Sequence, residues 1–225
     1  MRVDGILFDK DGTLFDFNAT WVVWVERMIE ELVAGDESLR AALAGALGFD
    51  LATREFLPSS PVIAGTPEDV AEALEPILGG VMVDQLNEQA ANAPQVEAVP
   101  LAPLLEYFRA KGLRLGVATN DGEVPARAHL SRAGVDGHFD FIAGSDSGHG
   151  GKPEPGMCLA FATSEGLDPA RVVMVGDSTH DLIAGRAAGM QVVAVLTGPA
   201  SAEVLAPMAD AVLPDISHLP NWLES

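Results

Sequence analysis

The stretch Phe8-Asp9-Lys10-Asp11-Gly12-Thr13-Leu14-Phe15-Asp16 follows the apolar run of residues 3–8 and decides the fold of this chain. The apolar run predicts a buried strand. Residues two apart at the end of a strand project to one side, so Asp9 and Asp11 are expected to meet where the chain turns at Gly12. The same short pattern is also typical of a solvated turn, because Asp and Gly both favour turns.

A cation bound between these two acids would allow them to take part in catalysis. Mg²⁺ prefers oxygen ligands and would remove the repulsion between two carboxylates. One carboxylate can then attack phosphorus, while the other donates a proton to the leaving oxygen and later takes one from water. Asp9 and Asp11 are therefore candidate catalytic residues.

Further polar residues follow predicted strands or lie in loops that would line the same site. They are Thr119 and Asn120 after the apolar stretch 113–118, Lys152 in the Gly- and Pro-rich loop 150–155, and Asp177 and Asp181 after the stretch 172–175. In an open parallel sheet, ligands bind beyond the carboxyl ends of the strands. We therefore expect these side chains to share one site with Asp9 and Asp11.

Strand-like and helical stretches alternate along most of the chain. The predicted strands are 3–8, 113–118, 139–143, 172–175 and 191–196, with a short edge strand at 211–213. The predicted helices between them are 101–111, 125–133, 154–165, 181–188, 200–206 and 216–223. This alternation is typical of the α/β class, with a parallel sheet covered by helices on both faces.

Four motifs in order resemble those of the haloacid dehalogenase (HAD) superfamily, in the subgroup that looks like phosphoglycolate phosphatases. They are Asp9-x-Asp11-Gly12-Thr13, Thr119, Lys152 and Gly176-Asp177-x-x-x-Asp181. The resemblance implies a Rossmann-like parallel sheet, an inserted helical cap, a covalent aspartyl-phosphate and Mg²⁺. It covers residues 1–15 and 96–225, which we expect to form the catalytic core.

Residues 16–95 would be the cap, because their pattern is helical without an obvious buried strand. Asn18 is a possible cap of the first of these helices, and further helical runs are predicted at 37–46, 67–78 and 82–91. Trp21 and Trp24 are three residues apart. Their helical spacing favours a place in the core of the cap over a platform for substrate.

Carried over to this sequence, the resemblance makes Asp9 the nucleophile and a Mg²⁺ ligand, and Asp11 the general acid and base. It also makes the Asp11 main-chain carbonyl and Asp177 ligands of Mg²⁺. Asp181 would support either the metal ion or Lys152. We therefore expect a metal site built from Asp9, Asp11 and Asp177.

The phosphoryl group would be held by hydrogen-bond donors and one positive charge. The main-chain amides of Lys10, Asp11 and Asn120 and the hydroxyl of Thr119 would donate to its oxygens. Lys152 would neutralise charge on the phosphoryl group and on Asp9. The sequence departs from the family pattern at Asp121, where relatives often carry a basic residue. This departure weakens the expectation that a residue here binds the carboxylate of phosphoglycolate.

The composition excludes some partners and locations. The chain has 225 residues, 48% of them hydrophobic, and a formal net charge of −20, which argues against a nucleic acid or an anionic membrane as partner. The first predicted strand begins too early for a signal peptide, so we expect a cytoplasmic protein. Cys158 is the only cysteine and is predicted to be a buried small hydrophobe. The chain could be a monomer or a homodimer.

The sequence favours a Mg²⁺-dependent phosphatase that acts on a small phosphorylated metabolite of the phosphoglycolate kind. A phosphomutase of the β-phosphoglucomutase type is the alternative, since it shares the core, the nucleophile and the position of the cap. A mutase cap would need groups that hold a bisphosphate. The cap residues 16–95 contain three basic residues, Arg27, Arg40 and Arg54, and this number does not decide between a phosphatase and a mutase. A non-catalytic phosphate-binding module is a third possibility.

Overall fold

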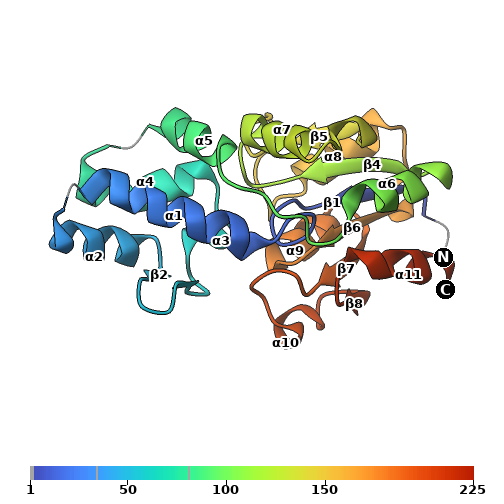
Figure 1. The fold of residues 1–225 in the computed structure, drawn as a ribbon. Coiled ribbons are helices and arrows are strands. Elements are labelled where there is room, and N and C mark those ends of the chain that lie inside the picture. The colour runs from blue at the N-terminus through green and yellow to red at the C-terminus, as the bar shows by residue number, and fades with distance from the viewer. Residues whose placement is uncertain (1–2, 34, 81) are drawn as a thin grey trace.

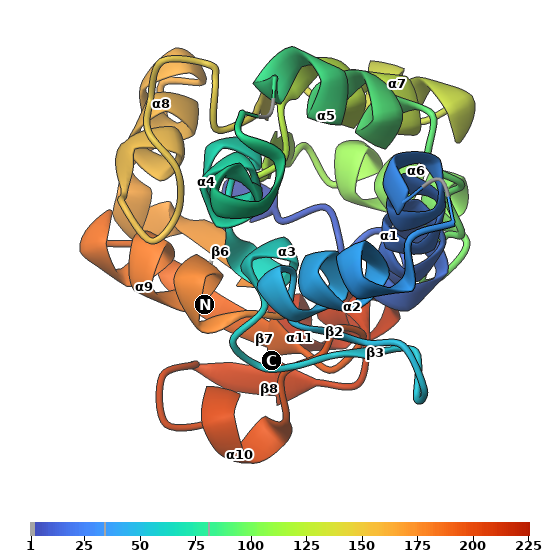
Figure 2. The same ribbon diagram turned by 90° about the vertical axis from the view of Figure 1, so that its left-hand side faces the viewer.

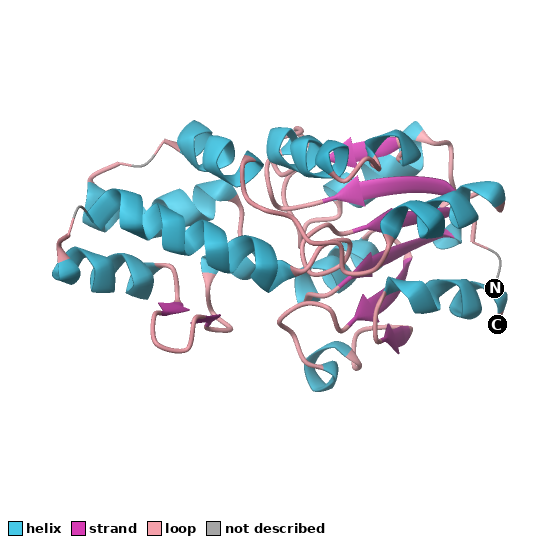
Figure 3. Cartoon of the chain, in the orientation of Figure 1, coloured by secondary structure: helices cyan, strands magenta, loops and turns pink. Residues whose placement is uncertain are grey.

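The computed structural model describes residues 3–33, 35–80 and 82–225, and its centre is a six-stranded parallel sheet. The strand order is β5-β4-β1-β6-β7-β8, and Figure 3 shows the strands running in one direction. The strands are β1 (Gly5–Phe8), β4 (Arg114–Ala118), β5 (Phe141–Ala143), β6 (Val172–Gly176), β7 (Gln191–Val195) and β8 (Ala211–Leu213). The predicted parallel sheet and its edge strand are confirmed.

Helices cover both faces of the sheet, and alternate strand residues pack against each face. Ile6 and Phe8 of β1 belong to a cluster with α6 (Leu101–Ala110), α7 (Glu123–Arg132) and α11 (Leu219–Glu224). Leu7 points to the other cluster. That cluster includes residues of α8 (Gly156–Ser164), α9 (Thr179–Ala187) and α10 (Ala202–Leu205). Three 3₁₀ turns, Asp136–His138, Pro169–Arg171 and Ile216–His218, complete this part of the chain.

The chain between β1 and α6 forms a helical cap beyond the carboxyl ends of the strands, on the left of Figure 1. Its helices are α1 (Phe17–Val33), α2 (Glu37–Ala46), α3 (Pro61–Ala64), α4 (Pro67–Leu78) and α5 (Val83–Ala91). Figure 2, which faces this end, shows these helices in front of the sheet. Their buried side chains form a hydrophobic cluster of their own.

One element of the cap differs from the prediction. A hairpin of β2 (Phe49–Asp50) and β3 (Glu55–Phe56) lies between α2 and α3, so the cap is helical apart from two very short strands. Strands of two residues are too short to show an alternating pattern in sequence. The Phe49 and Phe56 rings, 5.0 Å apart, pack against each other across the hairpin, and the Phe56 ring also packs against Phe17 of α1 at 5.6 Å.

The start of α1 also differs from the prediction. Asp16, and not Asn18, caps this helix, because its Oδ1 accepts a hydrogen bond of 2.8 Å from the amide of Ala19. A side chain caps a helix by accepting from an amide two or three residues further on, and Asp16 stands at that distance. Asn18 lies inside the helix and is exposed.

Two segments join the cap to the sheet and lie side by side. The amide of Asp16 donates to the carbonyl of Val96 at 2.9 Å, and the amide of Ala98 donates to the carbonyl of Leu14 at 2.9 Å. The predicted boundaries at residues 15/16 and 95/96 fall within this pair of segments, and the exact division stays a prediction. Within the described ranges, no helix has both the length and the apolar character that a membrane crossing requires.

Candidate active site

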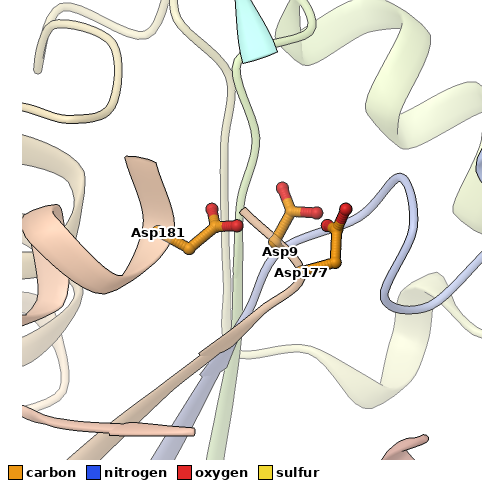
Figure 4. Close-up of side chains that lie close together, drawn as sticks. All are labelled: Asp9, Asp177 and Asp181. Carbon is orange, nitrogen blue, oxygen red and sulfur yellow. The ribbon is translucent and has the colours of Figure 1, made fainter. Parts of the chain in front are cut away.

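Three buried aspartates meet at the carboxyl end of the sheet. Asp9 follows β1, Asp177 follows the neighbouring strand β6, and Asp181 lies in the first turn of α9 (Figure 4). One carboxylate oxygen from each lies within 4.8 Å of the others. Because β1 and β6 are paired in parallel, their ends bring Asp9 and Asp177 together although the two are far apart in sequence.

Two glycines let the surrounding loops close on Asp177. Gly12 has a φ of +88°, and a Cβ there would lie 2.5 Å from the Asp177 carboxylate. A Cβ on Gly198, in the loop after β7, would lie even closer to the same carboxylate, at 1.7 Å. Neither position can accept a side chain without moving Asp177. The role of Gly198 was not predicted, because only the folded chain brings its loop to the site.

Lys152 lies between two of the acids. Its Nζ donates to Asp9 Oδ1 at 2.5 Å and to Asp181 Oδ1 at 2.6 Å. The other oxygen of Asp181 accepts from the amide and the hydroxyl of Ser178 at 3.0 and 2.7 Å, which forms the N-terminal cap of α9. Both oxygens of Asp181 are thus engaged, and one of them holds Lys152.

Asn120 fixes the loop that carries Lys152 and also contacts the cap. Its Oδ1 accepts from the amide of Lys152 at 2.7 Å, and its Nδ2 donates to the Lys152 carbonyl at 2.8 Å. The same Nδ2 donates to the carbonyl of Ala64 in α3 at 2.7 Å. Thr119 is buried next to it, and its Oγ accepts from the amide of Asp121 at 3.1 Å. The Thr119 hydroxyl proton can therefore point to another acceptor.

Burial changes the protonation of this cluster. It raises the pKa of Asp9 to about 7, against the opposing effect of Lys152. Burial and the neighbouring Asp9 also raise the pKa of Asp177 well above its ordinary value. Burial would lower the pKa of Lys152, but Asp181 and Asp9 outweigh it and raise that pKa. A divalent cation at this place would favour the ionised carboxylates.

The donor set fits a hard divalent cation such as Mg²⁺. The candidate ligands are carboxylate oxygens, which Mg²⁺ prefers, and they are held on neighbouring backbone segments. The Oδ1 of Asp11 is buried and has no hydrogen-bond partner among the described residues, which suits the proton transfers expected of this carboxyl group. The residues present therefore suit the ion that the sequence predicts.

The side chain of Lys10 points away from this cluster into a second buried group of charges. It is fully buried, with Nζ 2.6 Å from Asp11 Oδ2 and 3.1 Å from Asp121 Oδ2. It also donates to Nδ1 of His129 at 3.0 Å, while Nε2 of His129 donates to the carbonyl of Ala90 in α5 at 2.8 Å. This group links Asp11 to the cap.

Burial sets the protonation of the second group as well. It raises the pKa of Asp121 to about 6, with Lys10 opposing, and together with Lys10 it lowers the pKa of His129 to about 4. The pKa of Lys10 is raised, because Asp11 and Asp121 outweigh the effect of burial. Sequence reasoning missed His129 and the Lys10 side chain. The one feature of the sequence that indicated this second group was Asp121, an acidic residue at a position where relatives often carry a basic one.

A cavity that opens to solvent lies between the core and the cap. The predicted site residues that line it are Asp9, Asp11, Thr119, Asn120, Lys152, Asp177 and Asp181. Lys10 is not among the lining residues, and the proposed role of its main-chain amide stays a prediction. Trp21 and Trp24 belong to the hydrophobic cluster of the cap, as predicted, but they also line this cavity.

Comparison with known proteins agrees with the geometry. The sequence profile of the haloacid dehalogenase-like hydrolases matches residues 6–195. The chain belongs to this family. The predicted resemblance is confirmed, and with it the prediction that the protein is an enzyme, a hydrolase. A phosphoglycolate phosphatase of Neisseria meningitidis serogroup A is 31% identical over 232 residues, covering 100% of this chain and 94% of the relative.

Solved structures share the fold of this HAD-family chain. A predicted phosphoglycolate phosphatase from Haemophilus somnus has a TM-score of 0.72 at 18% identity, covering 99% of this chain and 98% of the other. A putative β-phosphoglucomutase from Thermotoga maritima has a TM-score of 0.68 at 20% identity, covering 99% of both chains. The shared fold therefore does not separate a phosphatase from a mutase.

Proposed function

We propose that this hydrolase is a Mg²⁺-dependent phosphatase that cleaves a small phosphomonoester through an aspartyl-phosphate on Asp9. The observation that carries the proposal is the buried group of Asp9, Asp177 and Asp181 with Lys152 bonded to Asp9. It supplies a nucleophile, a positive charge and a set of oxygen ligands within a few ångströms. These are the parts that phosphoryl transfer needs.

In the first step a carboxylate oxygen of Asp9 attacks phosphorus, and the bond from phosphorus to the leaving oxygen breaks. Asp11, as a carboxylic acid, gives its proton to that oxygen. In the second step Asp11, now a carboxylate, takes a proton from water while the water oxygen attacks phosphorus. The bond between phosphorus and Asp9 breaks, and inorganic phosphate leaves.

The remaining residues hold the phosphoryl group and the ion. Thr119 donates its hydroxyl proton, the main-chain amides of Lys10, Asp11 and Asn120 donate to other oxygens, and Lys152 balances their charge. Asp9, Asp177 and the Asp11 carbonyl would hold Mg²⁺, which would supply charge stabilisation for the phosphoryl oxygens and favour the ionised carboxylates. Asp181 positions Lys152, since the two are hydrogen bonded.

The name of the Neisseria relative makes phosphoglycolate the reference substrate for this proposal. A mutase of the β-phosphoglucomutase type uses the same nucleophile and remains the second candidate. The predicted cytoplasmic location and the predicted monomer or homodimer stay predictions.

The test is phosphate release from a panel of phosphomonoesters, with the metal removed by a chelator and Mg²⁺ then restored. We expect turnover that disappears with the metal and returns with Mg²⁺, with free phosphate as the product. Isomerisation of a sugar phosphate without net phosphate release would support the mutase instead. No turnover of any phosphate ester in Mg²⁺, including the reactive acetyl phosphate, would overturn the proposal.

A further inference from the structure

The cap contributes an apolar wall to the cavity. Its lining side chains include Phe17, Trp21, Trp24, Val62, Val70 and Leu86. Phe17, Trp21 and Trp24 follow one another along one face of α1. Among the described cap residues that line the cavity, none carries a charge. This wall faces the leaving group, because the phosphoryl-binding residues form the opposite, core side.

The three cap arginines lie elsewhere. Arg54 is bonded to Glu26 at 2.6 and 2.8 Å, and Arg40 to Glu30 and Glu37, on exposed parts of the cap. Arg27 lines a separate cleft. The cap sequence contains no lysine or histidine. The cap therefore has no cation with which to hold a carboxylate or a second phosphate of a substrate.

The two lysines of the core side do not supply that cation either. Lys152 is bonded to Asp9 and Asp181, and Lys10 is fully buried against Asp11 and Asp121. His180 lines the cavity beside Ser178, at the first turn of α9 on the core side. An anionic leaving group would meet an apolar wall above it and several carboxylates below. A buried charge without a partner is costly.

Two polar atoms in the wall have no partner among the described residues. Trp24 Nε1 is a donor and Asn87 Oδ1 is an acceptor, and both atoms are buried in side chains that line the cavity. Buried polar atoms normally have a partner. A hydroxyl group that reached either atom would give it a partner, by accepting from the indole or by donating to the amide oxygen.

We infer that the substrate is the monophosphate of an uncharged alcohol with an apolar or aromatic body, which can also carry a hydroxyl group. This inference rests on the proposed phosphatase function and concerns the leaving group alone. The inference predicts that phosphoglycolate and sugar bisphosphates are poor substrates, since each carries a second anionic group. The cavity between the core and the cap, which is lined by residues of both, is the place for such a body.

The experiment compares two esters that differ by one remote charge, benzyl phosphate and 4-carboxybenzyl phosphate, with phosphoglycolate beside them. We expect kcat/KM for benzyl phosphate to exceed that for either carboxylate by at least tenfold. Equal values, or a preference for a carboxylate, would overturn the inference. Acetyl phosphate, which has no sizeable leaving group, serves as the reference.

Acetyl phosphate distinguishes a failure of this inference from a failure of the proposed function. If acetyl phosphate is hydrolysed with Mg²⁺ but benzyl phosphate is not, the proposed function survives and the inference is wrong. If acetyl phosphate is not hydrolysed either, the proposed function fails, and the inference fails with it.

A variant of the wall tests the cause of the preference. Ile63 lines the cavity and is half-buried, so Ile63→Lys can place an ammonium group there, and Ile63→Met is the neutral control of similar length. We expect Ile63→Lys to shift the ratio of the two benzyl esters at least tenfold toward the carboxylate, and Ile63→Met to leave it unchanged. Partial unfolding lowers both rates and leaves the ratio intact. An unchanged ratio in Ile63→Lys would count against a wall that selects by charge.

Discussion

The core side of the cavity is lined by charged groups, whereas the cap side is lined by apolar ones. The core side contributes Lys152 and five aspartates, whereas the described lining residues of the cap are uncharged; the aspartates are Asp9, Asp11, Asp121, Asp177 and Asp181. The charged side is built at strand ends, where the backbone fixes polar groups for chemistry. The apolar side is the back of a helical hydrophobic cluster. The difference separates the reaction, which the core performs, from the choice of leaving group, which falls to the cap.

The largest expected effect is on the core side. Asp9→Asn removes the nucleophile with little change of shape, and we expect kcat to fall by about 10⁴-fold or more. Phosphate release under saturating Mg²⁺ measures the loss, and thermal unfolding checks that the variant folds. Turnover within tenfold of the wild type would mean that the core acids do not perform the reaction.

Removal of the second buried cation should affect stability strongly. Lys10→Met leaves Asp121 and Asp11 without their partner, and we expect a loss of about 3–5 kcal/mol of unfolding free energy, measured by denaturant titration. The double variant Lys10→Met/Asp121→Asn should recover part of this loss, because the buried carboxylate is removed as well. If the double variant is less stable than the single one, the charges are not coupled as described.

Lys152→Met should act on catalysis. Without its ammonium group the phosphoryl charge is not balanced, and we expect kcat/KM to fall by about 10²–10³-fold. Lys111→Met is the matched control, since Lys111 is an exposed lysine bonded to Glu224 and should change activity little. Similar activities for the two variants would remove Lys152 from the proposed site.

His129 should make stability depend on pH. Its folded pKa of about 4 lies below the ordinary 6.5, so the neutral form is favoured in the folded state. This contribution is complete above pH 6.5 and is lost as the pH falls toward 4, by about 3 kcal/mol in all. His129→Gln keeps one donor and one acceptor but does not titrate.

The measurement is the unfolding free energy of wild type and His129→Gln at several pH values between 7 and 4. The wild type should lose more stability than the variant over this range. Parallel curves would show that His129 is not held neutral between Lys10 and the cap.

The smallest effect is expected on the outside of the cap. Arg54→Gln breaks an exposed ion pair with Glu26, and we expect little change in stability, because water and salt screen such a pair. Its kcat/KM should equal that of the wild type. A clear loss of kcat/KM would show that a cap arginine reaches the substrate, and the contrast between a charged core side and an uncharged cap side would no longer hold.

Much of the core could be predicted because its signals are local. Fully buried strands such as β6 and β7 read as continuous apolar runs, and helices end at glycines. Cys158 is buried, as predicted, and burial raises the pKa of its thiol to about 12. The hairpin at β2 and β3 and the capping role of Asp16 were not predicted, because they depend on a few residues in context.

Short-range periodicity predicts the α/β class and the order of the core strands and helices, and motifs at strand ends predict the residues of the site. Only the folded chain shows that Lys10 faces Asp121 and His129, that Gly198 closes on Asp177, and that the wall of the cap is uncharged. These contacts join residues far apart in the chain, and their partners are set by packing, which no local pattern encodes.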